Sequence, residues 1–455
     1  MFQNLAAYRA SRSDDFWQTS VPEHWAVLPG MAVIAENKRK NVGLLEQRVL
    51  SLSFGRVVVK PVEKQRGLVP ESYEGYQILD PGDIVVRPTD LQNDQRSIRV
   101  GLVRDRGIIT SAYIGLRPRG PWSTGYGHAY LATVDSTKRI YGMGSGLRQQ
   151  LGWVDLKRMP CLVPPPEEQA AIVKYLAHAN ARIDAAIAAK RRLVALLGES
   201  IDATADELVT GVGEVRRLST VIADGPTNGV SPSVTEDGTL ETFSISAVRD
   251  GVVDVRPSDV KYVDASAVRE LAKYELRAGD VLLVRGNGNL RLVGRAGLVL
   301  EAMPDRIYPD LLIRVRLTAE VDPAYVVTAL NSRMVREQIE VAARTAVGTY
   351  KLNGADVRGL RLAVPPIEIQ RRILGQLEDR TAAARAAMTR ASSEIELLQE
   401  FRTRLVADVV TGQVDVRALA AALPEVESAS AWGDSDVPDD GEPADLDELL
   451  VNSEL

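Results

Sequence analysis

Two long stretches of the chain carry the same pattern of apolar positions, 201 residues apart. In both, apolar residues recur at steps of three, four or seven, which is typical of the narrow buried seam of a coiled-coil helix. The first stretch has Ile172, Leu176, Ile183, Ile187, Val194, Leu197, Ile201 and Leu208. The second has Ile373, Leu377, Ala384, Met388, Ile395, Leu398, Arg402 and Val409. We predict two helices that pair along this seam, with Arg402 near a frayed or partner-covered end.

Proline and glycine mark where each predicted helix begins and ends. The helices follow Pro164-Pro165 and Pro365-Pro366, and they stop at Thr210-Gly211 and Thr411-Gly412. Proline suits the first turn of a helix, and glycine suits the position just past its last turn. Because these signals repeat without a gap, two unrelated amphipathic helices are the less favoured interpretation.

A segment with strand patterns precedes each predicted helix. Apolar runs such as Val57-Val58-Val59 and Ile84-Val85-Val86 alternate with turns rich in Gly, Pro and Asp. Residues 79–85 and 276–282 share a Gly-Asp turn before an apolar run, which we interpret as scaffold. Between such anchors the two segments diverge completely.

The predicted fold class is α+β, with two β-rich domains separated by two long helices that form an antiparallel coiled coil. The plan repeats internally with pseudo-two-fold symmetry, which would place the two domains at opposite ends of a rod. The predicted parts are a β-rich domain at 1–161, a helix at 164–212, a second β-rich domain at 213–363, a second helix at 365–413 and an acidic, mostly disordered tail at 418–455.

Composition narrows the class of protein. Hydrophobic residues make up 45% of the chain and charged residues 25%, as in ordinary globular proteins. No run of 18 apolar residues is present, and residues 1–15 lack the apolar core of a secretory signal. The single cysteine, Cys161, excludes an internal disulfide framework. We expect a cytoplasmic protein without a membrane span.

Charge is distributed unevenly along the chain. After Arg417 there are eleven acidic residues and no Lys or Arg, so the net charge of −6 leaves about +5 for residues 1–417. A mildly basic body with an acidic extension is compatible with binding a polyanion, although many enzymes share such a body.

The apparatus of an enzyme is missing from the sequence. It has no phosphate-binding Gly-x-x-x-x-Gly-Lys-Ser/Thr motif and no Asn/Asp-Pro-Pro-Tyr/Phe run of an amino-methyltransferase. His24, His128 and His178 are scattered and cannot form a metal cluster with one cysteine. We therefore predict no catalytic residues, metal or cofactor in this chain, and chemistry supplied by a partner.

Residues able to contact DNA gather in a few polar stretches. In the first β-rich domain they are Lys38, Arg39, Lys40, Arg87, Gln92, Asn93, Arg96, Arg99 and Arg148. In the second they are Arg285, Asn287, Asn289, Arg291, Thr349, Tyr350 and Lys351. We interpret residues 285–291 as a hairpin tip with cations at both ends, for which a solvated β-turn is an equal alternative. Ordinary surface charge competes as an explanation for every residue named, and residues 38–40 could grip phosphates or solvate a turn.

The repeated plan resembles the specificity subunit of a Type I restriction–modification system. The resemblance covers residues 21–417 and rests on the Pro-Pro-x-x-x-Gln starts, which reach Gln169 and Gln370, and on the Thr-Gly stops. It also rests on Pro-Gly-Asp-Ile-Val at 81–85 and on Gly-Ser-Gly-Leu-Arg-Gln-Gln-Leu at 144–151.

The resemblance implies two target-recognition domains, each reading one half of a bipartite site on double-stranded DNA, and a coiled coil that fixes the spacer at about one to two helical turns. It implies two S-adenosylmethionine-dependent methyltransferase subunits that methylate adenine, and restriction subunits with ATP- and Mg-dependent translocation.

Two other functions remain open from the sequence. The chain could be a coiled-coil scaffold that presents two β-rich protein-binding heads, or an orphan transcriptional or anti-restriction factor with the same heads. Salt-dependent binding of duplex DNA distinguishes the first alternative, and copurification of a methyltransferase distinguishes the second.

Overall fold

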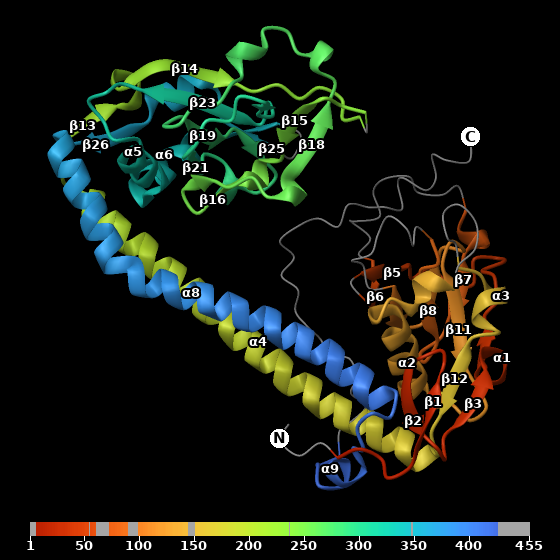
Figure 1. Cartoon of the computed structure of the whole chain (residues 1–455). Coiled ribbons are helices and arrows are strands. Elements are labelled where there is room, and N and C mark those ends of the chain that lie inside the picture. Colours follow the sequence, from red (N-terminus) through yellow and green to blue (C-terminus); the bar gives the residue numbers. More distant parts are fainter. Residues whose placement is uncertain are drawn as a thin grey trace. The chain divides into compact units, whose positions relative to one another are not determined.

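The computed structural model describes residues 6–53, 55–60, 72–89, 99–143, 151–235, 237–346 (344–346 as backbone only) and 349–425 (Figure 1). The chain divides into two compact units. Unit 1 comprises Met1–Arg191 and Ser392–Leu455, and unit 2 comprises Arg192–Ala391. We call residues 6–163 head 1 and residues 214–364 head 2. Each unit thus holds one β-rich head and a part of each long helix, and the predicted α+β class is confirmed.

The two long helices are α4 (Pro166–Val209) and α8 (Ile367–Val410), each of 44 residues. They begin and end at positions 201 residues apart, as the proline and glycine pattern predicts. After each helix the chain continues through a glycine in the left-handed region, Gly211 at φ +72° after α4 and Gly412 at φ +75° after α8. A residue with a Cβ atom adopts this conformation only at a cost, so the Thr-Gly stop has a backbone reason.

Ion pairs join the two helices inside each unit. They are Asp184–Arg402 and Lys190–Glu394 in unit 1, and Glu207–Arg380 in unit 2. In unit 1, rising residue numbers on α4 meet falling residue numbers on α8, so the helices run antiparallel there. The supercoiled packing of a coiled coil stays a prediction.

The placement of Arg402 corrects the prediction made from the seam. Its guanidinium donates a hydrogen bond to Asp184 Oδ1 at 2.7 Å, and the two side chains are only 15% and 16% exposed. An ion pair between the helices therefore stands where the pattern called for an apolar residue. Arg402 lies eight residues before the end of α8 and is not at a frayed end.

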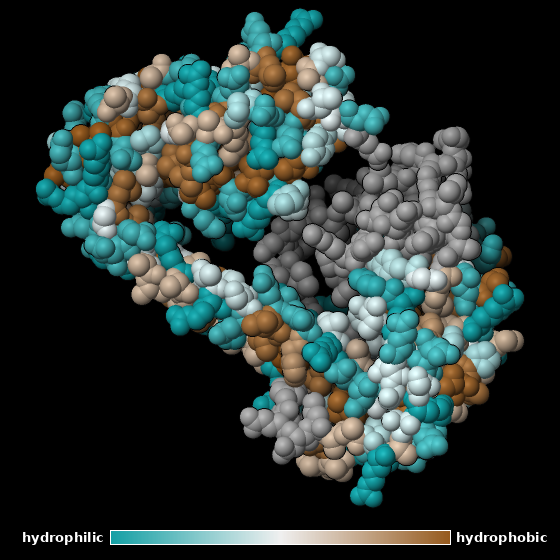
Figure 2. Space-filling model, in the orientation of Figure 1, coloured by the Kyte–Doolittle hydropathy of each residue, from teal (hydrophilic) through white to brown (hydrophobic). Residues whose placement is uncertain are grey.

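Burial varies along the predicted seam. Ile172, Leu176, Ile183, Ile187, Ile373 and Leu377 are buried, whereas Val194, Leu197, Met388, Ile395 and Leu398 are half-buried. Figure 2 shows that the visible side of the long helices is largely hydrophilic, with scattered apolar side chains. Ile183 and Ile187 lie well inside α4 and belong to the buried cluster of unit 1, against which Ile395 and Leu398 of α8 pack, so the seam stays buried some way along the helices.

Head 1 is built on a six-stranded sheet in the order β4-β11-β8-β9-β6-β5. Its strands are β4 (Ile34–Glu36), β5 (Leu50–Ser53), β6 (Arg56–Val59), β8 (Ile84–Val86), β9 (Val100–Leu102) and β11 (Ile114–Pro118). Two-stranded sheets add β1 (Ser11–Asp14) with β2 (Thr19–Pro22), β7 (Gln77–Leu79) with β10 (Gly107–Ile109), and β3 (Ala26–Pro29) with β12 (Pro160–Val163). The helices are α1 (Gly30–Val33), α2 (Thr124–Ser136) and α3 (Trp153–Leu156).

Head 2 repeats this architecture with the order β14-β23-β19-β21-β17-β16. Its strands are β14 (Ile222–Asn228), β16 (Val248–Arg249), β17 (Val252–Val253), β19 (Val281–Val284), β21 (Ala296–Leu298) and β23 (Leu312–Leu317). Smaller sheets join β13 (Glu214–Arg217) with β26 (Arg361–Val364), β15 (Leu240–Phe243) with β18 (Val260–Val263) and β22 (Arg306–Ile307), and β20 (Gly286–Asn287) with β25 (Thr349–Lys351) and β24 (Arg344–Ala346). The helices are α5 (Pro323–Asn331), α6 (Arg333–Ala342) and α7 (Gly354–Gly359).

The two six-stranded sheets match strand for strand. Each begins with three antiparallel pairings, continues through one parallel pairing (β9 with β6, β21 with β17) and ends on an antiparallel hairpin. The prediction that the heads diverge completely between their anchors is therefore wrong for the sheets. The repeat is not visible in the sequence because these strands, of two to seven residues, share their order and pairing but few residue identities.

The Gly-Asp turn acts as scaffold in both heads. Asp83 accepts two hydrogen bonds from Arg117 of β11 (2.7 and 2.9 Å), and Asp280 accepts two from Arg316 of β23 (2.8 and 3.3 Å). Both carboxylates are buried and also accept from a backbone N–H three residues earlier. Each aspartate thus ties the start of the central strand to its neighbour.

The C-terminal boundary lies later than the tail predicted at 418–455. Arg417–Ala421 form α9, and Ala420 is buried in the core of unit 1. Beyond it, Glu425 pairs with Lys174 of α4 at 2.7 Å, and the carbonyl oxygen of Pro424 lies 3.0 Å from His178 Nε2. Residues 426–455, which hold most of the predicted tail, lie outside the described residues.

Candidate nucleic-acid interface

In head 2, two polar segments far apart in the sequence form one surface. β20 pairs with β25, so that Gly286 faces Lys351 and Asn287 faces Tyr350. The N–H of Leu352 donates to the carbonyl of Arg285 at 2.9 Å and extends the pairing. The two predicted groups of DNA-contacting residues in head 2 are thereby brought together.

Residues 285–295, which we call recognition loop 2, connect β19 to β21 and are anchored at their start. The N–H of Arg285 donates to the carbonyl of Leu311 at 2.7 Å, and its Nη1 donates to the carbonyl of Asp310 at 3.2 Å. A Cβ on Gly286 would lie 3.1 Å from Leu311 and 3.2 Å from the Lys351 side chain. Glycine therefore lets the loop approach β25 closely.

The prediction that residues 285–291 form the tip of a hairpin is wrong. β20 pairs with the distant β25, and the chain next forms a 3-10 turn at Leu290–Leu292. Asn287 Oδ1 accepts from the N–H of Asn289 (2.8 Å), and Asn289 Oδ1 accepts from the N–H of Arg291 (3.0 Å). These side-chain bonds favour the turn over a two-stranded ladder.

Recognition loop 2 is also held from beneath. The guanidinium of Arg336, on α6, donates to the carbonyls of Leu290 (3.1 Å) and Val293. Burial lowers the pKa of Arg336 below its ordinary value. Because both asparagine oxygens are used inside the loop, a base contact by Asn287 or Asn289 would come from its NH2 group.

The surface carries an excess of positive charge. Residues 281–300 contain Arg285, Arg291 and Arg295 and no acidic residue, and residues 349–355 contain Lys351 and no acidic residue. Arg291 and Lys351 are exposed, whereas Thr349 and Tyr350 are half-buried. A rigid loop with exposed cations, amide groups and a tyrosine is suited to gripping phosphates and reading base edges.

In head 1, the described ends of the two equivalent segments meet through one backbone hydrogen bond. Residues 87–99, which we call recognition loop 1, connect β8 to β9, and the N–H of Leu151 donates to the carbonyl of Pro88 at 3.0 Å. This bond matches the one from Leu352 to Arg285 in head 2. Arg87 is half-buried at the start of the loop. The predicted Gln92, Asn93, Arg96 and Arg148 lie outside the described residues.

Arg99 is wrong as a base-contacting candidate because its side chain is fully buried. The guanidinium donates to the carbonyl of Thr89 and to Tyr141 Oη, whose ring it also covers at 5.5 Å. The backbone N–H of Arg99 donates to Asp135 of α2 at 2.6 Å. Arg99 therefore closes the base of recognition loop 1 from the inside.

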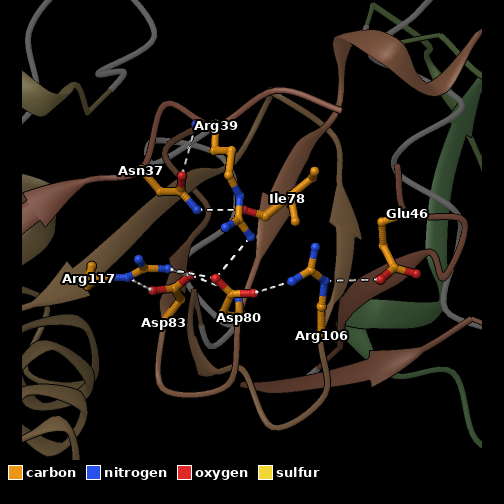
Figure 3. A network of polar contacts seen from close by, with 8 residues as sticks. All are labelled: Asn37, Arg39, Glu46, Ile78, Asp80, Asp83, Arg106 and Arg117. Atoms are coloured by element: carbon orange, nitrogen blue, oxygen red, sulfur yellow. Dashed lines mark hydrogen bonds and ion pairs between the residues drawn. The ribbon is translucent and has the colours of Figure 1, made fainter. Parts of the chain in front are cut away.

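Of the predicted cluster at 38–40, Arg39 belongs to a network of ion pairs within head 1 (Figure 3). Arg39 donates to Asp80 at 2.9 Å, and Asp80 also pairs with Arg106 (3.4 Å) and Arg117 (3.2 Å). The hydrogen bond from Arg39 lowers the pKa of Asp80 below its ordinary value, and Arg106 and Arg117 lower it further.

This network lies away from the recognition loop. Asp83 precedes β8 and Arg87 follows it, so the network and recognition loop 1 occupy opposite ends of one strand. Lys38 pairs with Glu36 at 3.1 Å, and Lys40 joins a backbone bridge to Gln77 and has an exposed side chain. Arg39 thus braces the Gly-Asp turn through Asp80, whereas Lys40 has no ion pair within the part of the chain that the structure describes.

A glutamine in the first turn of each long helix, which we call the root of the helix, is a functional candidate that the sequence prediction did not include. It belongs to the Pro-Pro-x-x-x-Gln motif described above. Gln169 Oε1 accepts from the N–H of Ser123 (2.8 Å), and Gln370 Oε1 accepts from the N–H of Asp322 (2.8 Å). Both glutamine side chains are buried. The repeated Pro-Pro-x-x-x-Gln signal could have identified them as contacts between helix and head.

Glu168, next to Gln169, is the buried centre of a polar network that no motif in the sequence indicates. Its carboxylate accepts from Tyr8 Oη (3.0 Å) and Trp25 Nε1 (2.9 Å), lies 2.7 Å from His24 Nε2 and pairs with Arg417 (3.3 Å). Burial raises the pKa of Tyr8 above its ordinary value, and the charge of Glu168 raises it further. The network joins the start of the chain, α4 and the segment after α8.

Two further properties bear on function. Among the described residues, no helix combines the length and apolar content needed to cross a membrane. Within the same part of the chain, no three His, Cys, Asp or Glu side chains meet in a group that could hold a metal ion.

No protein-family model matches the chain, but curated proteins are similar to parts of it. The specificity subunit of the Type I restriction enzyme EcoKI from Escherichia coli (strain K12) is 29% identical over 189 residues, 41% of this chain and 40% of that protein. The StySPI specificity subunit from Salmonella potsdam is 26% identical over 168 residues, 33% of this chain and 36% of that protein. The matches thus span about two fifths of the length of these relatives.

One solved structure shares the fold. It is described as the structural basis underlying complex assembly and conformational transition of the type I R-M system, and it aligns with a TM-score of 0.56 at 15% identity. The alignment covers 87% of this chain and 100% of that one. With the two curated relatives, it confirms the resemblance to Type I specificity subunits.

Proposed function

We propose that this chain, a relative of the Type I specificity subunits, is the DNA sequence-recognition subunit of a Type I restriction–modification complex. Each head would read one half of a bipartite site, and α4 with α8 would fix the spacer. The observation that supports the proposal is the pairing of β20 with β25, which joins the polar segment that contains exposed Arg291 to the one that contains exposed Lys351. Head 1 has the matching backbone bond between Leu151 and Pro88.

The chemistry of this surface supports DNA over a neutral ligand. Exposed Arg291 and Lys351 would contact phosphates or the acceptor edge of guanine, and the amide NH2 groups of Asn287 and Asn289 would donate to base acceptors. Because the loop is fixed by Arg336 and by its own asparagines, little conformational entropy would be lost on binding.

The catalytic steps would come from partners. Two methyltransferase subunits using S-adenosylmethionine would each dock on one repeat of this chain, and they would methylate adenine. Restriction subunits would add ATP- and Mg-dependent translocation and cleavage. The complex would work in the cytoplasm on double-stranded DNA, with this chain contributing no catalytic residue.

Duplex binding by the full chain tests the surface directly. The double variant Arg291→Ala, Lys351→Ala should weaken binding about tenfold or more. The slope of log K against the logarithm of the salt concentration should become shallower by about one to two. The matched control is Arg217→Ala, Arg361→Ala, which removes the same charge from β13 and β26 at the root of α8. The probe is a duplex selected from randomised DNA by the wild-type chain.

The control variant should bind as the wild type does. An equal loss in both double variants would mean that only net charge matters and would contradict the proposed surface. If the wild-type chain selects no duplex at all, the scaffold with two protein-binding heads replaces the proposal. If it binds DNA but no methyltransferase copurifies with it, the orphan factor replaces it.

A further inference from the structure

We propose that Gln169 and Gln370 are positioning residues that fix each head on its long helix and so set how strictly the length of the DNA spacer is read. The inference rests on the proposed function. It assigns to two buried side chains, remote from the recognition loops, a part of specificity separate from reading bases.

The amide of Gln169 joins two helix starts in unit 1. Its Oε1 accepts from the N–H of Ser123 at 2.8 Å, the residue just before α2. Its Nε2 donates to the carbonyls of Pro121 (2.7 Å) and Pro164 (2.9 Å). Only 1% of the side chain is exposed, so water cannot replace these bonds without a rearrangement.

The amide of Gln370 makes the same junction in unit 2. Its Oε1 accepts from the N–H of Asp322 at 2.8 Å, just before α5, and its Nε2 donates to the carbonyl of Pro365 at 2.8 Å. The side chain is fully buried. A primary amide is needed at both sites because one end must accept and the other must donate.

α2 and α5, whose starts are bonded to Gln169 and Gln370, each contact the base of a recognition loop at their other end. In unit 1, Asp135 near the end of α2 accepts from the N–H of Arg99, at the end of recognition loop 1 (2.6 Å). In unit 2, the side chain of Asn331 at the end of α5 accepts from the N–H and donates to the carbonyl of Ala296, directly after recognition loop 2 (both 2.9 Å). α2 and α5 are therefore struts between the root of a long helix and the base of a recognition loop.

A strut fixed at both ends transmits the orientation of the long helix to the recognition loop. If the glutamine end is released, the head can rock on its helix while the recognition loop keeps its own shape. Such a head would accept half-sites at shifted distances and still read the same bases. Fixed geometry of this kind is what makes a site selective against small displacements.

The two roots differ in how many bonds secure them. In unit 1, Glu168 adds hydrogen bonds from Tyr8 and Trp25 beside Gln169, whereas the equivalent position in unit 2 is the apolar Ile369. Release of Gln370 should therefore free its head more than release of Gln169 frees the other.

The experiment uses the assembled complex and duplexes with the wild-type half-sites and spacers of the native length or one base pair longer or shorter. The variants are Gln370→Met and Gln169→Met, which keep side-chain length but neither donate nor accept. We expect the ratio of methylation rates, native spacer over altered spacer, to fall about tenfold in Gln370→Met, equivalent to about 1.4 kcal/mol. A smaller fall is expected in Gln169→Met, and both variants should keep the wild-type half-sites.

A rate that drops equally on all three spacers would overturn the inference, because it would assign the glutamines to stability alone. Arg291→Ala, Lys351→Ala is the matched contrast, since it should lower the rates without changing the spacer ratio. If Gln370→Met does not fold, Gln370→Glu keeps the acceptor for Asp322 and removes the donor, and the same change in ratio is required. Failure of the wild-type complex to methylate any of the duplexes would refute the proposed function instead.

Discussion

The roots of the two long helices are built on one plan but fastened differently. In unit 2, Gln370 ties the head to α8 beside Ile369, whose side chain is half-buried among apolar neighbours. In unit 1, Gln169 makes the equivalent tie, but its neighbour Glu168 also binds Tyr8, Trp25 and Arg417.

The difference follows from how the chain builds the two units. Unit 2 is one continuous segment, whereas unit 1 is assembled from the start of the chain and the segment after residue 391. Bringing two distant segments together costs loop-closure entropy, which contacts between them must offset. The carboxylate of Glu168 gathers donors from both segments at one point. The two units thus share the same fold, and the unit built from two separate segments has additional hydrogen bonds and an ion pair at the point where those segments meet.

Removing the carboxylate of Glu168 should cause the largest loss of stability. Glu168→Ala should destabilise unit 1 by about 3 kcal/mol, because it leaves the buried donors of Tyr8 and Trp25 without an acceptor. Denaturant unfolding followed by tryptophan fluorescence measures this, since residues 192–391 contain no tryptophan and the signal reports on unit 1.

The matched change in unit 2 is Ile369→Ala. It removes part of a half-buried apolar side chain and should cost about 1 kcal/mol, visible in circular dichroism and silent in tryptophan fluorescence. Equal costs at the two positions would show that Glu168 is no more than a cap of the first helical turn.

Unit 1 has a buried histidine where unit 2 has a valine, so the stabilities of the two units should respond differently to mild acid. His128 of α2 and Val327 of α5 occupy equivalent positions and are both 4% exposed. Burial, together with the charge of Arg104, lowers the pKa of His128 to about 4. The unfolded chain binds this proton below about pH 6.5, so stability is complete above that pH and is lost as pH falls toward 4.

The expected loss from His128 is about 3 kcal/mol between pH 6.5 and pH 4. His128→Val, which copies unit 2, should flatten the pH dependence of unit 1 unfolding by that amount, as measured by tryptophan fluorescence in denaturant at each pH. The control is unit 2, whose unfolding should have the same pH dependence in both proteins. An unchanged slope for unit 1 would show that His128 takes up its proton in the folded state as readily as in the unfolded state.

The sequence was sufficient for the features that depend on neighbouring residues. The helix bounds followed from proline, glycine and apolar spacing, and the Gly-Asp turn was recognised as scaffold. Long-range pairings were beyond it: nothing local indicates that Gly286 meets Lys351, or that Arg99 is buried against Tyr141. Arginine is usually exposed, and its burial depends on partners that only the fold supplies. For the same reason the Arg402 ion pair with Asp184 was mistaken for a weak point in the seam.

A map of methylated adenines in the host genome tests the central claim most directly. It would be recorded for cells with the wild-type chain, without it, and with Arg291→Ala, Lys351→Ala. The account predicts a bipartite motif that disappears without the chain, and a double variant that loses or relaxes only the half read by head 2. A variant that alters both halves together, or a map unchanged by deletion of the chain, would contradict it.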